Sequence, residues 1–467
     1  MDDRAQLLRL EADNAELKAE NAELRAENAE LRRRLAQVEH QLHQILQRRK
    51  RTGAKRPPKA GTPADRRRQE HRQHPGAVRD EPPPGTSFLE HDVHPARCPH
   101  CGATDLEATG AFDDHFVADL PEPKVEWHRY RRHVHRCRHC QKTCQGRGDL
   151  ELPGAHIGPR ARLLTCYGRA HLGISLGKTQ NLLHDFFGLT ISRAGLLGHL
   201  RWGGTLFAPV VEELLELLRH SPVVQGDETG WRINGQAAWA WCFRDPRLAI
   251  FLIEHHRSRD VILRALGAGF AGTLVSDFYA AYNGLVCAKQ RCLVHLLREL
   301  AKLREELPWQ SVRAFIQPLI SLFQDAIQLG KDREQYRPAA FAQAYQALQD
   351  RFDELLLNCH SRQPDCVRIW RRLFKHADEL FTFLRDPQVP ADNNGSERDI
   401  RSLVAARNDG GTHRTDWSAA AFGRLKSIIV TGMKNGVRFA QYGLDVVRAK
   451  LAGQPLPLPL VAASDTG

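Results

Sequence analysis

The sequence predicts a multidomain α/β protein whose core is a mixed β-sheet interrupted by an all-α insertion. Three observations lead to this prediction. Short apolar runs typical of buried strands come first and then alternate with a helical pattern in the middle of the chain. Residues 296–385 carry helical spacing throughout, and a heptad repeat occupies the first 48 residues. With 467 residues, the chain is long enough for two or three domains.

Residues 1–48 predict a parallel dimeric leucine zipper. Apolar residues recur every seven positions at heptad position d, namely Leu10, Leu17, Leu24, Leu31, Val38 and Ile45. Three asparagines at position a fix the register and favour two strands. Acids at position g meet bases at position e of the partner, as Glu20 and Arg25 would. The alternative, a lone helix packed on the core, would bury those asparagines badly.

The net charge of +12 is concentrated in one segment. Residues 48–79 hold twelve Lys and Arg residues and two acids. The segment is also rich in Pro, Gly and Gln, which predicts a disordered linker over residues 49–90. A flexible cationic arm binds phosphate backbones without reading sequence, so DNA contacts are expected at Arg66, Arg67 and Arg68. The alternative is a linker that only solubilises the protein.

Two cysteine pairs predict a structural zinc site. They are Cys98-x-x-Cys101 and Cys137-x-x-Cys140, separated by 35 residues. Each pair can place two thiolates on one metal ion, and together they complete a closed tetrahedral site. Two such pairs seldom occur by chance, although reduced cysteines without metal are the alternative.

The zinc-binding domain is expected to span residues 91–150 as a zinc ribbon. Residues 125–130 alternate apolar and polar side chains, which predicts a strand between the cysteine pairs. Its basic side chains suggest that the module touches DNA. Other residues compete as ligands, so the exact four stay open: His100, His133, His135, His139 and Cys144.

Residues 155–218 predict a helical domain that resembles a helix-turn-helix. The stretch LGKTQNLLHDFFGLTISRAGLLGHL predicts one helix, a turn at Gly188 and a second helix, with Ser192 as its N-cap. Such a shape can read DNA, but short helical hairpins also occur as simple packing elements.

The sheet core is expected at residues 219–440, with the helical insertion at 300–388 and a C-terminal tail at 441–467. After the first strand, apolar runs predict strands at 237–243, 248–253 and 273–276 and a helical pattern predicts a helix at 259–266. Trp231 is expected in the core, the usual place for tryptophan, rather than stacked on a displaced base.

Three acids stand in the second half of the chain: Asp227 in VVQGDETGW, Asp277 in TLVSDFYAAY and Glu397 in DNNGSERDIR. Each aspartate follows a short apolar run and is expected at the end of a buried strand, where an unpaired carboxylate is costly. Carboxylates that meet there repel one another, and a divalent cation relieves both problems. Mg²⁺ prefers such oxygen ligands, and a pair of these ions can clamp a phosphodiester.

Each acid also has an ordinary structural explanation. Asn394-x-x-Glu397 fits a capping box, in which the glutamate only satisfies a helix N-terminus. Asp227 would then simply end a strand, and Asp277 would cap a helix that starts at Phe278.

The residues around these acids favour a metal centre for a polyanion. Cys292-x-x-His295 follows the second acid and would orient its neighbourhood or bind nothing. Three basic residues follow the third acid and are expected to contact DNA: Arg398, Arg401 and Arg407. Arg401 lies one turn from Glu397, so an ion pair between them is the alternative.

The motifs DETGW, SDFYAAY followed by CLVHLLREL, and DNNGSERDIR, in this order, resemble those of the insertion sequence sixty-six family of bacterial transposases. The resemblance covers roughly residues 95–440. It implies a ribonuclease-H-like core and a DDE metal triad of Asp227, Asp277 and Glu397 that holds Mg²⁺ or Mn²⁺. The chain departs from the family pattern after Arg407, where it contains NDGGTHRTDW.

The resemblance implies a DNA transposase that cuts the ends of an insertion sequence and joins the 3′ hydroxyls to target DNA. Expected partners are both DNAs, a second copy through the zipper, and accessory proteins of the same element. No membrane span or secretory signal is predicted, so the protein is expected in the cytoplasm, at the bacterial nucleoid. Two alternatives are a dimeric zinc-containing DNA-binding regulator with an inactive core, and a hydrolytic nuclease.

Overall fold

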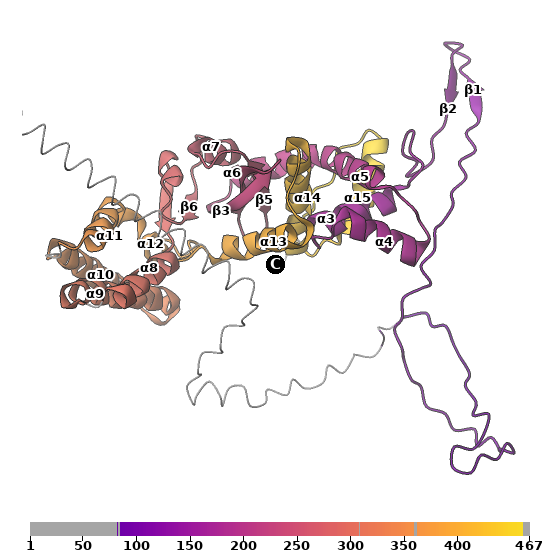
Figure 1. Ribbon diagram of the computed structural model, residues 1–467, viewed down its shortest axis with the longest axis horizontal. Helices are drawn as coiled ribbons and strands as arrows, with labels where there is room; N and C mark the ends of the chain where they lie inside the picture. The colour runs from indigo at the N-terminus through magenta and orange to yellow at the C-terminus, as the bar shows by residue number, and fades with distance from the viewer. Residues whose placement is uncertain (1–81, 83–84, 308, 359–361, 461–467) are drawn as a thin grey trace, which may run out of the picture. The chain divides into compact units, whose positions relative to one another are not determined.

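The computed structural model describes residues 82, 85–307, 309–358 and 362–460 (Figure 1). They fall into two compact units, divided between Asp119 and Leu120, and each unit is described by itself. The predicted zipper, most of the basic linker and its three arginines lie outside the described residues. In the part of the chain that is described, no helix is long and apolar enough to cross a membrane.

The second unit begins with a small antiparallel hairpin, β1 (Val134–Arg136) and β2 (Thr143–Gln145). The strand predicted over residues 125–130 is wrong: this stretch forms no strand, and Trp127 is 91% exposed. The reason is local. The turn that begins at Cys137 folds the chain back on itself, so the segments that flank this turn pair with each other.

Four helices follow: α3 (Pro159–Ala170), α4 (Leu176–Phe187), α5 (Arg193–Leu206) and α6 (Ala208–Arg219). The predicted helix–turn–helix boundaries are confirmed. Gly188 ends α4 with a positive φ of 64°, a conformation that glycine adopts without strain. The Ser192 side chain accepts a hydrogen bond from the Gly195 amide and so caps α5.

The central sheet has five strands in the order β5-β4-β3-β6-β7. They are β3 (Val223–Ile233), β4 (Gln236–Arg244), β5 (Ala249–Glu254), β6 (Thr273–Ser276) and β7 (Ala288–Arg291). Strands β3, β4 and β5 are antiparallel, whereas β6 and β7 run parallel to β3. Helix α7 (Arg259–Leu266) connects β5 to β6 at the predicted position.

Two features of the sheet differ from the sequence prediction. Asp227 does not end a strand, because β3 continues to Ile233 and pairs with β4 from Gln225 to that end. Strand β7 was missed because its sequence, AKQR, has no apolar run. Its Lys289, Gln290 and Arg291 side chains are nevertheless buried and hydrogen-bonded.

Three helices complete this part of the fold: α13 (Asn394–Gly410), α14 (Asp416–Lys434) and α15 (Phe439–Leu451). Figure 1 places α13 and α14 beside the sheet, and α14 packs on β5, where the Ser427 hydroxyl accepts the Phe251 amide. Between them, His413 stacks on Trp231. Trp231 is 3% exposed, so its predicted place in the core is confirmed.

The insertion is helical as predicted. It contains α8 (Leu293–Glu306), α9 (Gln310–Lys331), α10 (Pro338–Leu357), α11 (Pro364–Lys375) and α12 (Thr382–Arg385). It also contains the short 3₁₀ turns η2 (Arg333–Gln335) and η3 (Ala377–Glu379), whereas η1 (Ala280–Gly284) lies between β6 and β7. The helices enclose their own apolar core, which also receives Val223 and Val275 from the sheet.

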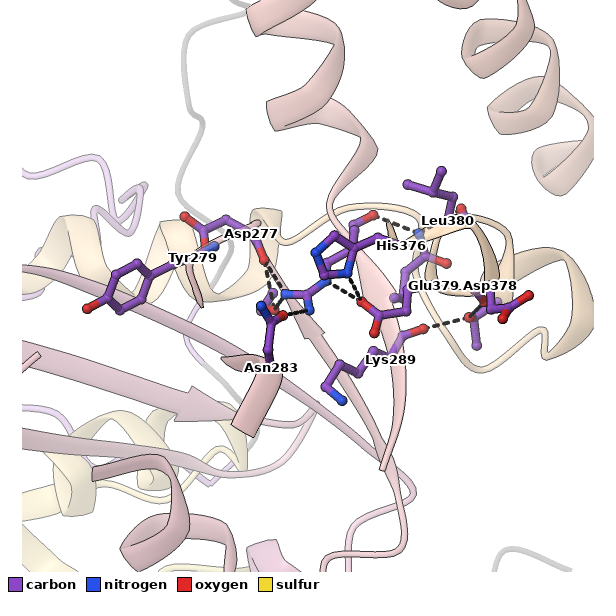
Figure 2. A network of polar contacts seen from close by, with 12 residues as sticks. Asp277, Tyr279, Asn283, Lys289, His376, Asp378, Glu379 and Leu380 are labelled. Atoms are coloured by element: carbon purple, nitrogen blue, oxygen red, sulfur yellow. Dashed lines mark hydrogen bonds and ion pairs between the residues drawn. The ribbon is translucent and has the colours of Figure 1, made fainter. Parts of the chain in front are cut away.

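A buried arginine joins the sheet to the insertion. Arg291 is fully buried, and its Nε lies 2.5 Å from a Glu379 carboxylate oxygen in η3. Its Nη1 donates to the Asp277 carbonyl at 2.8 Å, and its Nη2 donates to Asn283. Figure 2 shows how this network runs from Asp277 to Glu379 and His376. Arg291 of β7 therefore holds the backbone at Asp277, and Glu379 of the insertion holds Arg291.

Replacing Glu379 with Gln should destabilise the protein by about 3 kcal/mol near neutral pH, because the buried charge of Arg291 loses its carboxylate partner. Burial alone would raise the pKa of Glu379, but His376 and Arg291 lower it to about 2. This stabilisation is therefore present above the unfolded-state pKa of about 4.3 and is lost as the pH falls toward 2. Denaturant unfolding should show the difference between Glu379→Gln and wild type shrinking below about pH 4. An equal difference at all pH values would contradict this assignment.

Candidate active site

Two of the predicted acids lie at the same level on neighbouring strands. Asp227 is within β3, and Asp277 directly follows β6. Gln225 of β3 pairs in parallel with Val275 of β6, so the residues two positions further along each strand are Asp227 and Asp277. Since side chains alternate between the faces of a sheet, both point to the same face.

Helix α13 brings Glu397 to these strands. The Asn393 side chain, directly before the helix, donates to the carbonyl of Gly226 at 2.8 Å. The Gln225 side chain donates to the Asp392 carbonyl at 3.2 Å. These two bonds attach the start of α13 to β3 next to Asp227.

Asp277 and Glu397 lie close enough to Asp227 for their charges to oppose its ionisation. Burial raises the pKa of Asp227 to about 7, together with the charges of Glu228, Asp277 and Glu397. Neighbouring negative charges make a carboxylate harder to ionise, and a divalent cation reverses this effect.

The capping-box explanation for Glu397 is wrong. The residue at the cap of α13 is Asn393, and it makes no side-chain cap bond. One buried Glu397 oxygen, Oε1, has no hydrogen-bond partner among the described residues. The alternative helix at Phe278 is also absent, because this segment forms a turn in which Asp277 accepts the Tyr279 amide at 2.8 Å. A buried carboxylate oxygen without a partner, beside two further half-buried carboxylates, fits Mg²⁺ or Mn²⁺.

His295 on α8 extends the acidic centre. Its Nε2 lies 3.5 Å from Glu397 Oε1. Among the described residues, Cys292, His295 and Glu397 form a group whose ligand atoms lie within 4.8 Å of one another. Burial raises the pKa of the Cys292 thiol, and its sulfur accepts the Asn393 amide. The Cys292-x-x-His295 motif follows Asp277 in the sequence, but in the structure it lies beside Glu397.

A pocket of about 470 Å³ opens next to Asp277. Its lining includes four cationic side chains, Arg257, Arg298, Lys302 and Arg372, as well as His295. Arg257 was not predicted from the sequence. It lies in the segment HHRSRD, whose residues form no recognisable motif.

Two acids next to the triad have structural partners. The Glu228 side chain is 1% exposed and accepts hydrogen bonds from Arg257 at 2.9 and 2.6 Å. Asp399 lies 3.1 Å from both Arg244 and Lys434. Neither acid is therefore an inert neighbour of the triad.

The predicted DNA-contacting arginines of α13 differ in their surroundings. Arg398 and Arg401 are exposed. Arg401 lies 3.9 Å from Glu397, so the predicted alternative ion pair is present in weak form. Arg407 donates to the Gly230 carbonyl of β3 and lies over Trp231.

Each cysteine pair forms a tight turn. The Cys98 amide donates to Ala103 and the Gly102 amide donates to Cys98, while Cys137 makes the same pattern with Lys142 and Gln141. Backbone amides at His100 and Cys101 lower the pKa of Cys98, and those at Cys140 and His139 lower that of Cys137. Thiols that are easier to ionise suit a thiolate-bound metal. The two pairs lie in different units, so each is described alone.

Comparison with known proteins identifies the chain. Residues 157–421 match the family described as "Transposase IS66 family", and this match contains Asp227, Asp277 and Glu397. Residues 95–141 match the "zinc-finger binding domain of transposase IS66", which includes both cysteine pairs. No curated protein matches the chain. The first match alone covers more than half of the sequence, and the chain therefore belongs to the IS66 family of DDE transposases.

Proposed function

We propose that this transposase cuts the ends of its insertion sequence and joins the freed 3′ hydroxyls to target DNA by metal-dependent phosphoryl transfer. The observation that carries the proposal is the convergence of Asp227, Asp277 and Glu397, contributed by β3, by the end of β6 and by α13. Family membership is consistent with it. The reaction needs no covalent intermediate, so no Ser, Tyr or Cys nucleophile is required.

The core is proposed to be ribonuclease-H-like. Three antiparallel strands followed by two parallel ones, in the order β5-β4-β3-β6-β7, support this assignment. The proposed domains are a zipper at 1–48, a linker at 49–90, a zinc-binding domain at 91–150 and a helical domain at 155–218. The catalytic domain would follow at 219–440 with its insertion at 300–388, and a tail at 441–467.

Asp227, Asp277 and Glu397 would hold Mg²⁺ or Mn²⁺, which when bound supplies charge stabilisation for the attacking and leaving oxygens. The chain's own residues fix the geometry. The Tyr279 amide holds one Asp277 oxygen, and Arg291 holds the Asp277 backbone. His295 limits the positions available to Glu397. Together these contacts preorganise the carboxylates before DNA arrives.

DNA is proposed to contact several parts of the chain. The helix pair α4 and α5 has the shape of a DNA-reading motif, and the basic linker at 49–90 would add contacts that do not depend on sequence. Arg398 and Arg401 are exposed near the acidic centre and would contact phosphates. Arg407 is proposed as a third DNA contact. One of its guanidinium nitrogens donates to the Gly230 carbonyl, and its other N–H groups would bind a phosphate.

The zinc-binding domain is proposed to hold one Zn²⁺ through Cys98, Cys101, Cys137 and Cys140. The match to a zinc-finger domain and the lowered pKa values of Cys98 and Cys137 support this ligand set. A closed four-thiolate site would stabilise the fold of the module rather than take part in catalysis.

Deleting residues 1–48 should weaken or abolish dimers without unfolding the rest of the protein. The expectation rests on the uninterrupted heptad repeat with matched charges at positions g and e. Sedimentation at micromolar concentration compares the truncated and intact chains. The same oligomeric state in both chains would contradict the prediction that residues 1–48 form a dimeric zipper.

A cleavage and joining assay tests the proposed function. Full-length protein is incubated with Mg²⁺, DNA that carries the element's own ends, and a target plasmid. The proposal predicts cut ends that become joined to the plasmid. Cleavage without joining would identify a hydrolytic nuclease, and binding without cleavage would identify a DNA-binding regulator with an inactive core.

A further inference from the structure

Arg257 lies beside the acidic centre, where hydrogen bonds and aromatic rings hold its side chain in place. Its Nε and Nη2 atoms both donate to the same oxygen of Glu228, at 2.9 and 2.6 Å. The other Glu228 oxygen accepts the Tyr282 hydroxyl at 2.5 Å. Glu228 therefore accepts three hydrogen bonds, and with only 1% of its side chain exposed it is not available to a metal ion.

Two aromatic rings fix the plane of the Arg257 guanidinium. Its central carbon lies 3.8 Å from the ring centre of Tyr279 and 4.5 Å from that of Trp239. The Tyr279 hydroxyl in turn donates to the Arg257 carbonyl. Arginine suits such a position because its planar group stacks on rings while its edges still donate hydrogen bonds. The side chain is thus held in one orientation.

The remaining donors of Arg257 are available to the pocket. Among the described residues, its Nη1 makes no hydrogen bond, and the side chain is 33% exposed where it lines the pocket with Asp277. Tyr279, which carries the guanidinium on its ring, also binds the Asp277 carboxylate through its amide. Arg257 is therefore coupled to the second acid through one residue.

The rest of the pocket is also positive. Arg298 and Lys302 are exposed and lie one turn apart on α8. The second acid in the lining besides Asp277 is Glu299, which already binds Arg368 and Arg372. Cationic side chains at the edge of an acidic metal centre suit a phosphate backbone that passes over it.

We propose that this pocket binds the DNA phosphate next to the one that is cleaved, with Arg257 as its ligand and Glu228 as the residue that positions Arg257. The inference rests on the proposed function and names a subsite for its DNA substrate. Arg298 and Lys302 would bind the next part of the same strand.

Element-end duplexes with a single neutral methylphosphonate, placed in turn at each phosphate near the cleavage point, test the proposal. With wild-type protein, one neutral position adjacent to the cleaved bond should reduce the cleavage rate roughly 10- to 100-fold. Arg257→Gln should show a similar loss on unmodified DNA and no further loss at that position. Its binding should also depend less steeply on salt, with the log–log slope smaller by about 1.

In Glu228→Gln, the cleavage rate should depend less on the charge of that same phosphate and as strongly as before on the charge of the others. A merely structural role of Glu228 would not produce an effect limited to one phosphate. Arg264→Gln is the matched control, since Arg264 is an exposed arginine of α7 that does not line the pocket. If thermal unfolding shows that Arg257→Gln is not folded, the double variant Glu228→Gln/Arg257→Gln, which leaves no unpaired buried charge, takes its place.

A folded variant that remains as sensitive as wild type to every neutral phosphate would overturn the subsite. Failure of the wild-type protein to cleave unmodified ends would instead contradict the proposed function, so the two outcomes are distinguishable.

Discussion

Asp227→Asn, Asp277→Asn and Glu397→Gln should each reduce cleavage and joining by at least about 10²-fold. Each substitution preserves size and hydrogen bonding but removes one charge that would bind the metal ion. Dimerisation and DNA binding should change little, because these functions are proposed to depend on other segments. Cleavage of element ends and joining to a plasmid measure the loss, and gel-shift and sedimentation measurements show what is retained.

The choice of controls for these variants follows from the structure. Glu228 and Asp399 have the right charge, but Arg257, Arg244 and Lys434 bind them, so their neutral variants would disturb the site. Asp260→Asn and Glu305→Gln are better matched, since both acids are exposed.

The expected activity of the controls is close to that of wild type. Equal losses in the controls and in the triad variants would show that the triad is assigned incorrectly. Full activity in Glu397→Gln would show that the negative charge of this residue is not needed, so that Glu397 is not a metal ligand.

Cys137→Ser should remove zinc and unfold the zinc-binding module. Freshly purified wild-type protein is expected to carry about one zinc ion per chain, and loss of one thiolate opens a closed site. Because metal binding to such a module supplies its folding free energy, the effect should be a loss of the module's protease resistance. Elemental analysis and limited proteolysis measure both changes.

Cys166→Ser is the control for the zinc prediction. Cys166 is fully buried in the helical core, and burial raises its pKa to about 12, so it is no candidate ligand. This variant should keep its zinc. Absence of zinc from freshly isolated wild-type protein would contradict the zinc site itself.

The pattern of apolar residues along the chain made much of the fold predictable from the sequence. Strand β6 and helix α7 occur at the predicted residues, because a short apolar run marks the strand and helical spacing marks the helix. Strand β7 was unpredictable for the opposite reason: it buries polar side chains that bond to a distant segment, as Gln290 does with the Leu380 carbonyl. The hairpin β1–β2 depends on the turn at Cys137 rather than on alternation.

The candidate site likewise contains residues that the sequence pattern predicted and residues that it did not. Motif spacing singled out the three acids, and the fold places them together through long-range contacts such as Asn393 to Gly226. Arg257 and its partner Glu228 could not be found in this way, because 28 residues separate them in the chain and only the sheet brings them together. A residue whose role depends on a tertiary contact leaves no periodic signal in the sequence.

The metal site that we propose for Asp227, Asp277 and Glu397 can be tested most directly by iron-dependent cleavage of the protein backbone. Fe²⁺ replaces Mg²⁺ in oxygen-ligand sites, and with ascorbate and peroxide it cuts the chain near the bound ion. The account predicts fragments that end close to all three acids, competed away by Mg²⁺ and absent from Glu397→Gln but present in Glu305→Gln. Cleavage that misses any of the three acids, or an unchanged pattern in Glu397→Gln, would contradict a metal site shared by the three.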